Sequence, residues 1–415
     1  MLPDGWDAEV SLAGAQPKVE STQRLGLFGS FLCLTKINWG IGMMAMPYYM
    51  HLAGPWCGIV FFTISICLAA DGVMCLVRIP DASTRPCCTY AELVGSRLGI
   101  WGRRGALLSL LLANWGSAVA WIKFMGDNLH KFLPEVAASS AEWSLAVTVL
   151  TLPCALVESV EPLKRVSFAG LLAGQLFVVI LVAQAAVHWR HFGDYLATAR
   201  PGSGWQGLPI AMGIAVFCNE GMVVVTPSVH AEMRAPRWYP VALACMAVFF
   251  WVNYLAAGLA GDFLFGYVDG RPVQDEATLS LGLSGLHRAA VYSYVLQLAL
   301  TFPVMLFAVF VSFEDAWAGH RCGRVRVRLA RAGAIVFAGA LAVLVPRFGD
   351  FLALSGALGN SLGIYVLPQL CLLRATEAGR PLASGRRRIL SWTIVLVFGI
   401  ACGAVATVVS FQQLL

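Results

Sequence analysis

Charged side chains are scarce in this chain of 415 residues. Asp, Glu, Lys and Arg together make up 13% of it, whereas soluble domains carry about 25%. Hydrophobic residues account for 58%, which excludes a soluble globular domain and predicts an integral, multi-pass membrane protein. The sequence also lacks a clustered basic stripe, so we expect no nucleic-acid partner.

Several chemical signatures are missing as well. The twelve cysteines have neither metal-ligand spacing nor the pattern of a disulfide framework, and most lie in apolar runs, where cysteine packs as a small apolar residue. No cluster of a nucleophile with a base is recognisable. We therefore expect no enzyme activity, no metal site and no cofactor. Residues 1–24 lack the pattern of a removable signal peptide and are interpreted as a cytosolic N-terminal tail.

The most informative stretch lies in the first apolar run, 25–53. A continuous helix of 29 residues would be about 43 Å long, which exceeds the bilayer core of about 30 Å. Lys36, Gly40 and Gly42 interrupt its middle, and glycine weakens a helix by roughly 1 kcal/mol. Broken backbone at membrane depth survives only where it lines protein or a watery cavity. We predict a discontinuous helix whose centre binds a polar ligand. The alternative is a glycine face for helix packing.

Eleven apolar runs are long enough to cross a membrane. The Lys and Arg residues divide as 21 on the predicted inner segments and 6 on the outer ones, with two inside spans. This bias predicts a cytosolic N-terminus and, after eleven spans, an extracellular or lumenal C-terminus. The predicted spans are 25–53, 55–78, 105–129, 143–158, 166–189, 206–228, 238–265, 289–313, 328–346, 349–373 and 388–411.

The runs also suggest an internal repeat. Residues 25–189 form a first set of five spans, 207–373 a second set of nearly equal length, and 388–411 an eleventh helix. Because five is odd, the second set enters the membrane from the opposite side, so the repeat is inverted. Its first span is also interrupted, by Asn219-Glu220-Gly221. Paired broken helices in corresponding positions of two halves are typical of a transporter site.

These residues resemble the amino acid/auxin permease family, and in particular its proton-coupled amino acid transporter branch. The matching residues cover about 25–410. They are Lys36, Asn38, Gly40, Gly42 and Pro47 in the first span, Phe217, Glu220 and Gly221 in the sixth, the segment Glu232-Met233-Arg234-Ala235-Pro236, and also Asp127, Asn128, Gly261, Phe265, Gly266, Gly356 and Pro368.

The resemblance implies an all-α fold of the LeuT type, with a five-plus-five inverted repeat and one added helix. The chain departs from the family at two positions in the first span. Cys33 stands where many members of the branch have a histidine associated with proton coupling, and Ile41 replaces a small hydroxyl residue.

The broken helices suggest where a substrate binds. A helix N-terminus carries open N–H donors and a partial positive charge, so we expect the N–H groups of Ile41 and Gly42 to bind a carboxylate. Open carbonyls near Phe217, Cys218 and Asn219 would accept an amino group. The remaining candidates for substrate binding flank the two breaks and are Asn38, Trp39, Gly40 and Gly221.

Four ionisable residues inside the spans are candidates for ion coupling: Lys36, Glu220, Asp127 and Asp71. A lone charge at that depth is costly, so Lys36 and Glu220 are expected to pair; Glu220 is alternatively the proton carrier. Lys123 and Asp127 are four residues apart and are expected to pair along one helix.

The leading hypothesis is a secondary active transporter of amino acids, with small neutral substrates and proton symport. Asp71, Asp127 and Asp262 leave room for a cationic substrate instead. Sodium coupling is a further alternative, although no adjacent Ser/Thr pair occurs in the eighth span, and an amino-acid sensor is another. The expected partners are a small amino acid and the lipid bilayer of a plasma membrane or a lysosome- or vacuole-type membrane. No sequence feature predicts the oligomeric state.

Overall fold

The computed structural model describes residues 25–79, 89–156, 161–199, 201–202, 204–224, 226–282, 285–317, 324–377 and 380–414. Nearly all of this chain is helical. The only strands in these ranges are two residues each, β1 (Thr376–Glu377) and β2 (Arg380–Pro381), which pair antiparallel. Helices satisfy their own backbone hydrogen bonds, so apolar segments of this length form them in lipid.

The first half of the described chain folds into three long helices and seven shorter helical segments. In order they are α1 (Leu27–Asn38), the 3₁₀ turn η1 (Ile41–Ala45), α2 (Met46–Ala53), α3 (Pro55–Val77), α5 (Tyr90–Phe132), α6 (Ser140–Thr151), η2 (Leu152–Leu156), α7 (Glu161–Val187), η3 (Trp189–His191) and α8 (Phe192–Thr198).

The second half of the described chain is also helical and contains three π-helical stretches. In order they are η4 (Gly204–Gly207), α9 (Leu208–Phe217), α10 (Glu220–Val224), α11 (Thr226–Glu232), η5 (Pro236–Trp238), α12 (Tyr239–Asp262), η6 (Phe263–Val268), α13 (Ala277–Ser280), α14 (Gly285–Trp317), α15 (Arg324–Leu344), α16 (Phe348–Ser355), η7 (Gly356–Val366), α17 (Leu367–Arg374), α18 (Gly385–Thr393), η8 (Ile394–Cys402) and α19 (Gly403–Leu414).

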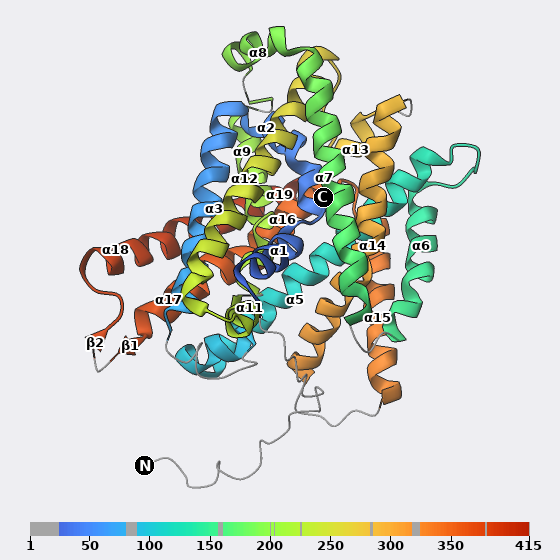
Figure 1. Cartoon of the computed structure of the whole chain (residues 1–415). Helices are drawn as coiled ribbons and strands as arrows, with labels where there is room; N and C mark the ends of the chain where they lie inside the picture. Colours follow the sequence, from blue (N-terminus) through green and yellow to red (C-terminus); the bar gives the residue numbers. More distant parts are fainter. Residues whose placement is uncertain are drawn as a thin grey trace.

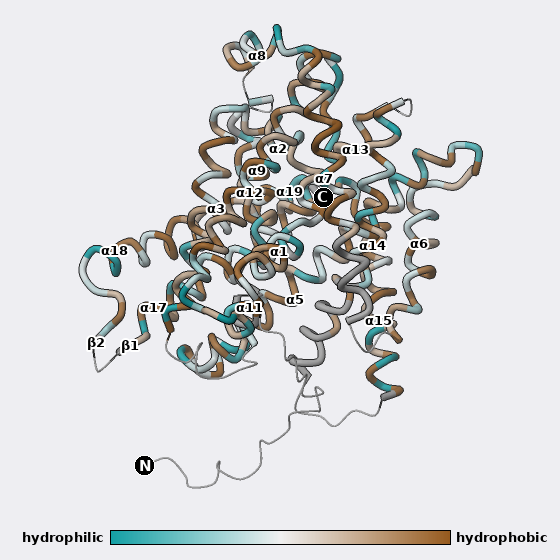
Figure 2. The backbone as a smooth tube through the Cα atoms, in the orientation of Figure 1, coloured by the Kyte–Doolittle hydropathy of each residue, from teal (hydrophilic) through white to brown (hydrophobic). Residues whose placement is uncertain are grey.

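Within the described residues, 7 helical segments are long and apolar enough to cross a membrane. Three shorter apolar segments accompany them, Leu27–Lys36, Ser140–Leu156 and Leu208–Met222. Apolar residues run along the long helices in Figure 2, whereas polar residues are conspicuous on α8 and near α11. The composition and the helices together describe a helical membrane protein.

The third predicted span, 105–129, begins earlier than the hydropathy suggested. Helix α5 starts at Tyr90 and runs for 43 residues. Thr89 and Glu92 form a capping box, in which each side chain accepts a hydrogen bond from the other residue's backbone N–H, and such a box stabilises a helix start. Gly99 interrupts the helix with φ of 72°. Part of the segment between the second and third predicted spans is therefore helical.

The middle of the bundle is tightly packed. Helix α9 lies against α16, and a Cβ atom on Gly213 or Gly356 would collide with the facing backbone. Small residues permit this close approach of membrane helices. Helices α7 and α14 run side by side, and α6 and α15 lie at one side of the bundle (Figure 1).

The two ends of the bundle differ. At the end that carries α11, Leu25 donates a backbone hydrogen bond to the Glu232 carbonyl at 2.8 Å and accepts one from the Arg234 N–H at 2.9 Å. The start of α1 is therefore fastened to the chain that follows α11. Helices α8 and α13 lie toward the opposite end (Figure 1). We refer to these as the α11 end and the α13 end.

Candidate substrate site at two facing helix breaks

The predicted interruption of the first span is confirmed. Helix α1 ends at Asn38, and the chain resumes as η1 at Ile41. Between them Gly40 is extended, with φ of −125° and ψ of −170°. This turn leaves the last carbonyls of α1 without helical partners, so they become available to side chains or ligands.

Side chains from two other helices bond to these carbonyls. The Tyr254 hydroxyl of α12 donates to the Asn38 carbonyl at 3.2 Å. From α14, the Tyr294 hydroxyl donates to the Gly40 carbonyl at 2.8 Å, and the Gln297 amide donates to the Trp39 carbonyl at 3.4 Å. The break is thus supported by α12 and α14, because unpaired carbonyls in a buried place are costly.

The predicted interruption of the sixth span is also confirmed. Helix α9 ends at Phe217 and α10 begins at Glu220. Asn219, which lies between them, is fully buried and donates to the Ser65 hydroxyl of α3 at 2.8 Å. The Ser65 hydroxyl in turn is 2.7 Å from the hydroxyl of Tyr365 in η7. This chain of hydrogen bonds fixes the second break against two neighbouring helices.

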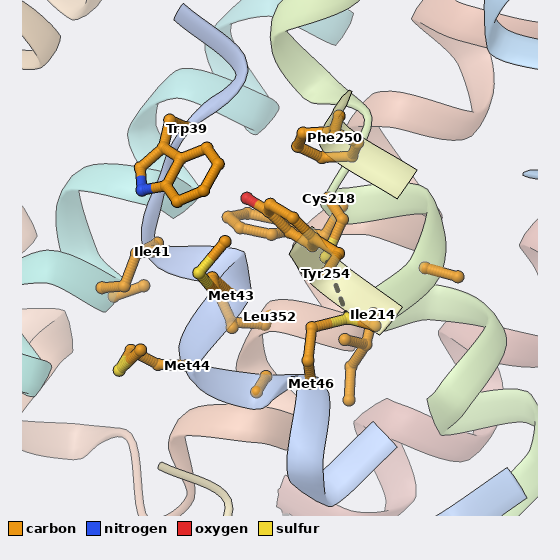
Figure 3. Packing of buried hydrophobic residues seen from close by; sticks show 14 of the residues in the cluster. Trp39, Ile41, Met43, Met44, Met46, Ile214, Cys218, Phe250, Tyr254 and Leu352 are labelled. Atoms are coloured by element: carbon orange, nitrogen blue, oxygen red, sulfur yellow. Dashed lines mark hydrogen bonds between the residues drawn. The ribbon is translucent and has the colours of Figure 1, made fainter. Parts of the chain in front are cut away.

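The two breaks face each other (Figure 3). A Cβ atom on Gly42 would lie 2.9 Å from the Cys218 Sγ atom and 3.3 Å from the Phe217 ring. The Cys218 Sγ atom also contacts the Met46 sulfur at 3.9 Å. Gly42 therefore permits close contact between the two halves of the molecule, whereas a Cβ on Gly40 would meet no atom within 4 Å.

Four buried polar atoms at the breaks lack hydrogen-bond partners among the described residues. Trp39 is 3% exposed, and its ring packs against Tyr254 with centroids 6.2 Å apart. Among the described residues, the buried atoms Asn38 Oδ1, Trp39 Nε1, Asn219 Oδ1 and Gln297 Oε1 have no hydrogen-bond partner. Buried polar groups normally have partners, so these atoms can contact the polar groups of a bound molecule.

The four coupling candidates lie in different parts of the structure. Glu220 begins α10 beside the second break and accepts a hydrogen bond from the Ser117 hydroxyl of α5 at 2.7 Å. Lys36 lies in the last turn of α1, and its expected pair with Glu220 stays a prediction. Asp127 and Asp71 lie away from the breaks, each in its own polar cluster.

The two outlying carboxylates have clear partners. The Lys123 ammonium donates to Asp127 at 2.6 Å, so the predicted pair along α5 is confirmed. Asp71 accepts two hydrogen bonds from the Arg387 guanidinium, at 2.8 and 2.9 Å. Arg387 belongs to α18, more than 300 positions away in sequence, so this bidentate pair was not visible in the sequence.

Sequence reasoning also missed the side chains that support the breaks. Tyr254 and Tyr294 stand in apolar runs and look like core residues. Gln297 offered a signal, because an amide in the middle of an apolar span needs a hydrogen-bond partner. Ser117 carried no such signal, since a serine in a membrane helix commonly bonds to its own backbone.

A cavity of about 810 Å³ lies at the α13 end, outside the contact between the breaks. Side chains from α2, α5, α16 and the segment before α13 line it, including Tyr48, Asp127, Lys131, Asp275 and Arg347. The cavity therefore lies on the predicted outer side. At the α11 end, by contrast, backbone hydrogen bonds of Leu25 hold the start of α1 against the chain that follows α11.

Two facing, interrupted helices in a helical membrane protein are typical of the LeuT-type fold. Solved structures match this fold. A Na⁺-coupled sialic acid symporter in an outward-open state aligns with a TM-score of 0.53 at 12% identity, covering 93% of this chain and 95% of that one. Mhp1 in its inward-facing conformation aligns with a TM-score of 0.54 at 13% identity, covering 94% and 90%.

The chain belongs to the family described as "Transmembrane amino acid transporter protein", which it matches over residues 24–414. The Arabidopsis thaliana amino acid transporter AVT1D is 26% identical over 92% of this chain and 68% of its own length. Another Arabidopsis relative, the amino acid transporter ANT1, is 26% identical over 79% and 80%. The rat vesicular inhibitory amino acid transporter is 23% identical over 81% and 66%. The chain is thus an amino acid transporter of this family and not an enzyme.

Proposed function

We propose that this transporter moves small neutral amino acids by proton symport. The main observation behind the proposal is the direct contact between the two helix breaks, where Gly42 lies against Cys218. The chain in which this contact occurs belongs to an amino acid transporter family. A substrate held between two halves that move relative to each other is the arrangement that alternating access needs.

The substrate groups are assigned by backbone chemistry. The N–H groups of Ile41 and Gly42, at the start of a helical turn, bind the carboxylate. The carbonyls near Phe217 and Cys218 accept the α-amino group, and that of Asn219 is shared with the Met222 N–H at 3.2 Å. The other substrate-contacting candidates are Asn38, Trp39, Gly40 and Gly221.

A neutral substrate is favoured over a cationic one because the spare carboxylates already have partners. Asp71 pairs with Arg387, and Asp127 pairs with Lys123. Asp262 lies 3.1 Å from the His51 ring and accepts a hydrogen bond from the Tyr195 hydroxyl at 2.7 Å. Among the described residues, each of these three carboxylates therefore already has a hydrogen-bonding or ionic partner.

Protons are favoured over sodium because hydrogen-bond donors occupy the carbonyls of the first break. Tyr294 and Gln297 of α14 donate to the Gly40 and Trp39 carbonyls, where a cation would need open oxygen ligands. The Thr301 hydroxyl of the same helix donates to its own helix backbone at 2.8 Å. We assign the coupling proton to Glu220.

For the membrane arrangement we propose eleven spans, with 25–189 and 207–373 as inverted repeats and 388–411 as the eleventh helix. The N-terminal tail 1–24 is cytosolic, and the C-terminus is extracellular or lumenal. The α13 end then faces outside or the lumen of a plasma membrane or a vacuole-type membrane. The 7 long and three shorter apolar segments, together with the 33-residue helix α14 over the eighth predicted span, support this count.

Uptake by proteoliposomes tests the proposal. The purified protein is given a panel of labelled amino acids with and without an imposed pH gradient, in sodium and in choline buffers. We expect accumulation of small neutral amino acids that needs the gradient and not sodium. Accumulation that requires sodium would contradict proton coupling, and preference for arginine or lysine would contradict the substrate class.

The Glu220 assignment has its own test. Glu220→Gln mimics the protonated carboxyl, so uptake driven by a pH gradient should fall while substrate exchange persists. If Glu220 only neutralises Lys36, the same change leaves a buried cation unpaired, and the surface level falls instead. In that case Lys36→Met combined with Glu220→Gln should restore it. Full pH-driven uptake by a well-expressed Glu220→Gln protein would exclude both roles.

A further inference from the structure

The kink of α5 at Gly99 forms an exposed corner of the bundle. The part of α5 before the kink lies at the α11 end, where Figure 1 draws it in blue to cyan. Two apolar side chains follow the kink on the protein surface, Ile100 with an exposed fraction of 56% and Trp101 with 76%. Arg103 and Arg104 come next and are also exposed. We refer to these four residues as the α5 corner.

Packing holds both arginine side chains at this corner. A Cβ atom on Gly95, before the kink, would lie 3.0 Å from the Arg103 Cβ atom and 3.7 Å from its Cδ atom. The Arg103 stem therefore runs along the glycine of the preceding segment. The guanidinium carbon of Arg104 lies 5.1 Å from the centroid of the Trp101 ring, which is a cation–π contact. Side chains that are already ordered lose less entropy when a ligand binds.

Neither arginine has an acidic partner in the part of the chain that the structure describes. The ion pairs found there join Asp71, Asp127, Asp262 and Asp350 to other basic residues. Glu92, the carboxylate nearest in sequence before the kink, accepts from the backbone N–H of the capping box. Each guanidinium carries five N–H donors, so the corner presents two positive charges and several open donors to an anion.

The position of the corner along α5 places it at the surface of the bilayer. Residues 105–122, directly after Arg104, contain no charged side chain, and the side chain of Leu108, one turn beyond Arg104, is exposed. Tryptophan and arginine at the end of an apolar span lie at the level of the lipid headgroups. The phosphate groups of lipids lie at this depth, and guanidinium groups bind phosphate oxygens through paired N–H donors.

We propose that the α5 corner binds the headgroup of an anionic phospholipid. Arg103 and Arg104 contact its phosphate, and Ile100 and Trp101 lie against the apolar part of the same lipid. Charge complementarity favours an anionic lipid, because a zwitterionic headgroup already carries a cation for its own phosphate. The side of the membrane rests on the proposed orientation of the chain, which puts the α11 end in the cytosol, whereas the lipid site itself does not.

A bound lipid would support the helix on which the second break depends. It holds α5 at its kink, and the same helix carries Ser117, whose hydroxyl donates to Glu220 beside that break. The expected effect is a higher Tm in a membrane that contains the lipid, because a ligand that binds only the folded state stabilises it.

Thermal unfolding in lipid nanodiscs tests the site. The full-length protein is placed in nanodiscs of phosphatidylcholine alone and in nanodiscs that also contain phosphatidylglycerol. We expect a higher Tm with phosphatidylglycerol, and we expect Arg103→Gln and Arg104→Gln each to lose most of this rise. Both side chains are exposed, so these variants should match the unaltered protein in phosphatidylcholine. Native mass spectrometry should show phosphatidylglycerol retained by the unaltered protein and lost from the double variant.

Arg237→Gln is the matched control. Arg237 is exposed and lies 6.0 Å from the centroid of the neighbouring Trp238 ring, in the segment that follows α11. It therefore shares the charge, the aromatic neighbour and the end of the bundle, but it does not belong to the α5 corner. We expect this variant to keep the full rise in Tm.

Three results would overturn the proposal. The first is the absence of any rise in Tm with phosphatidylglycerol. The second is an equal loss in Arg237→Gln, which would indicate a diffuse positive surface. The third is an equal rise on addition of soluble glycerol phosphate to phosphatidylcholine nanodiscs, which would indicate a site for free phosphate. None of these measurements uses uptake, so a failure of proton symport would leave the lipid site unaffected.

Discussion

At the scale of single residues, the two glycines of the first break, Gly40 and Gly42, have different structural roles. A Cβ on Gly42 would press on Cys218 of the other half, whereas a Cβ on Gly40 would enter open space. The requirement for glycine at position 42 therefore follows from packing between the breaks. At position 40 the side-chain space is unoccupied, so a requirement for glycine there would come from the ligand.

This difference predicts a contrast between two alanine variants. Gly42→Ala should lower the free energy of unfolding by about 1–3 kcal/mol, the usual cost of overpacking, and reduce transport. Gly40→Ala should change stability much less. Cys218→Ala removes the contacting sulfur, so it should restore stability to Gly42→Ala. Denaturant titration and uptake assays of the three variants provide the measurements. Equal destabilisation by Gly40→Ala would contradict the packing argument.

The breaks could be predicted from the sequence, but their supports could not. Glycines and polar or charged residues within an apolar run are local signals, and they located both interruptions correctly. Tyr254, Tyr294 and Gln297 contact the first break from helices more than 200 positions away, and such contacts depend on tertiary packing. Glu276, which directly precedes α13, is fully buried. It lies in a polar connecting segment, where a carboxylate is normally exposed to solvent, so the sequence could not predict its burial.

At the scale of elements, one network of charged and polar side chains joins α18 to α3 and α17. Both Asp71 oxygens accept from the Arg387 guanidinium, and the Gln369 amide of α17 donates to Asp71 at 2.8 Å. Paired donors of this kind match the fork of arginine. Helices α3, α17 and α18 are thereby joined at one point.

We expect Arg387→Met to lower the free energy of unfolding by about 2 kcal/mol, because Asp71 loses two charge-assisted hydrogen bonds. Arg387→Lys should recover only part of this loss, since lysine lacks the bidentate fork. Arg388→Met is the matched control, because Arg388 is exposed and adjacent. Denaturant titration of the purified proteins measures the differences. Equal effects at the two arginines would show that the Asp71 pair contributes little.

At the scale of the whole molecule, the two ends of the bundle are in different states. Backbone hydrogen bonds join Leu25 to the chain after α11, while a cavity of about 810 Å³ lies at the α13 end. A transporter that exposes its site alternately to two sides must break one set of contacts while it forms another. The contacts of Leu25 are thus expected to open when the cavity at the α13 end closes.

The proposed membrane arrangement ties these two ends to opposite sides of the bilayer. With eleven spans and most Lys and Arg residues on the inner segments, an N-terminal tag should be protected in intact cells, and it should be accessible on intact isolated vacuoles, whose outer surface faces the cytosol. A C-terminal tag should be reachable from outside or from the lumen. Antibody accessibility before and after permeabilisation measures this. Because an odd total of eleven spans places the two termini on opposite sides of the bilayer, both tags on one side would refute the eleven-span arrangement. It would also remove the assignment of the α13 cavity to the outer side, while leaving the contact between the breaks in place.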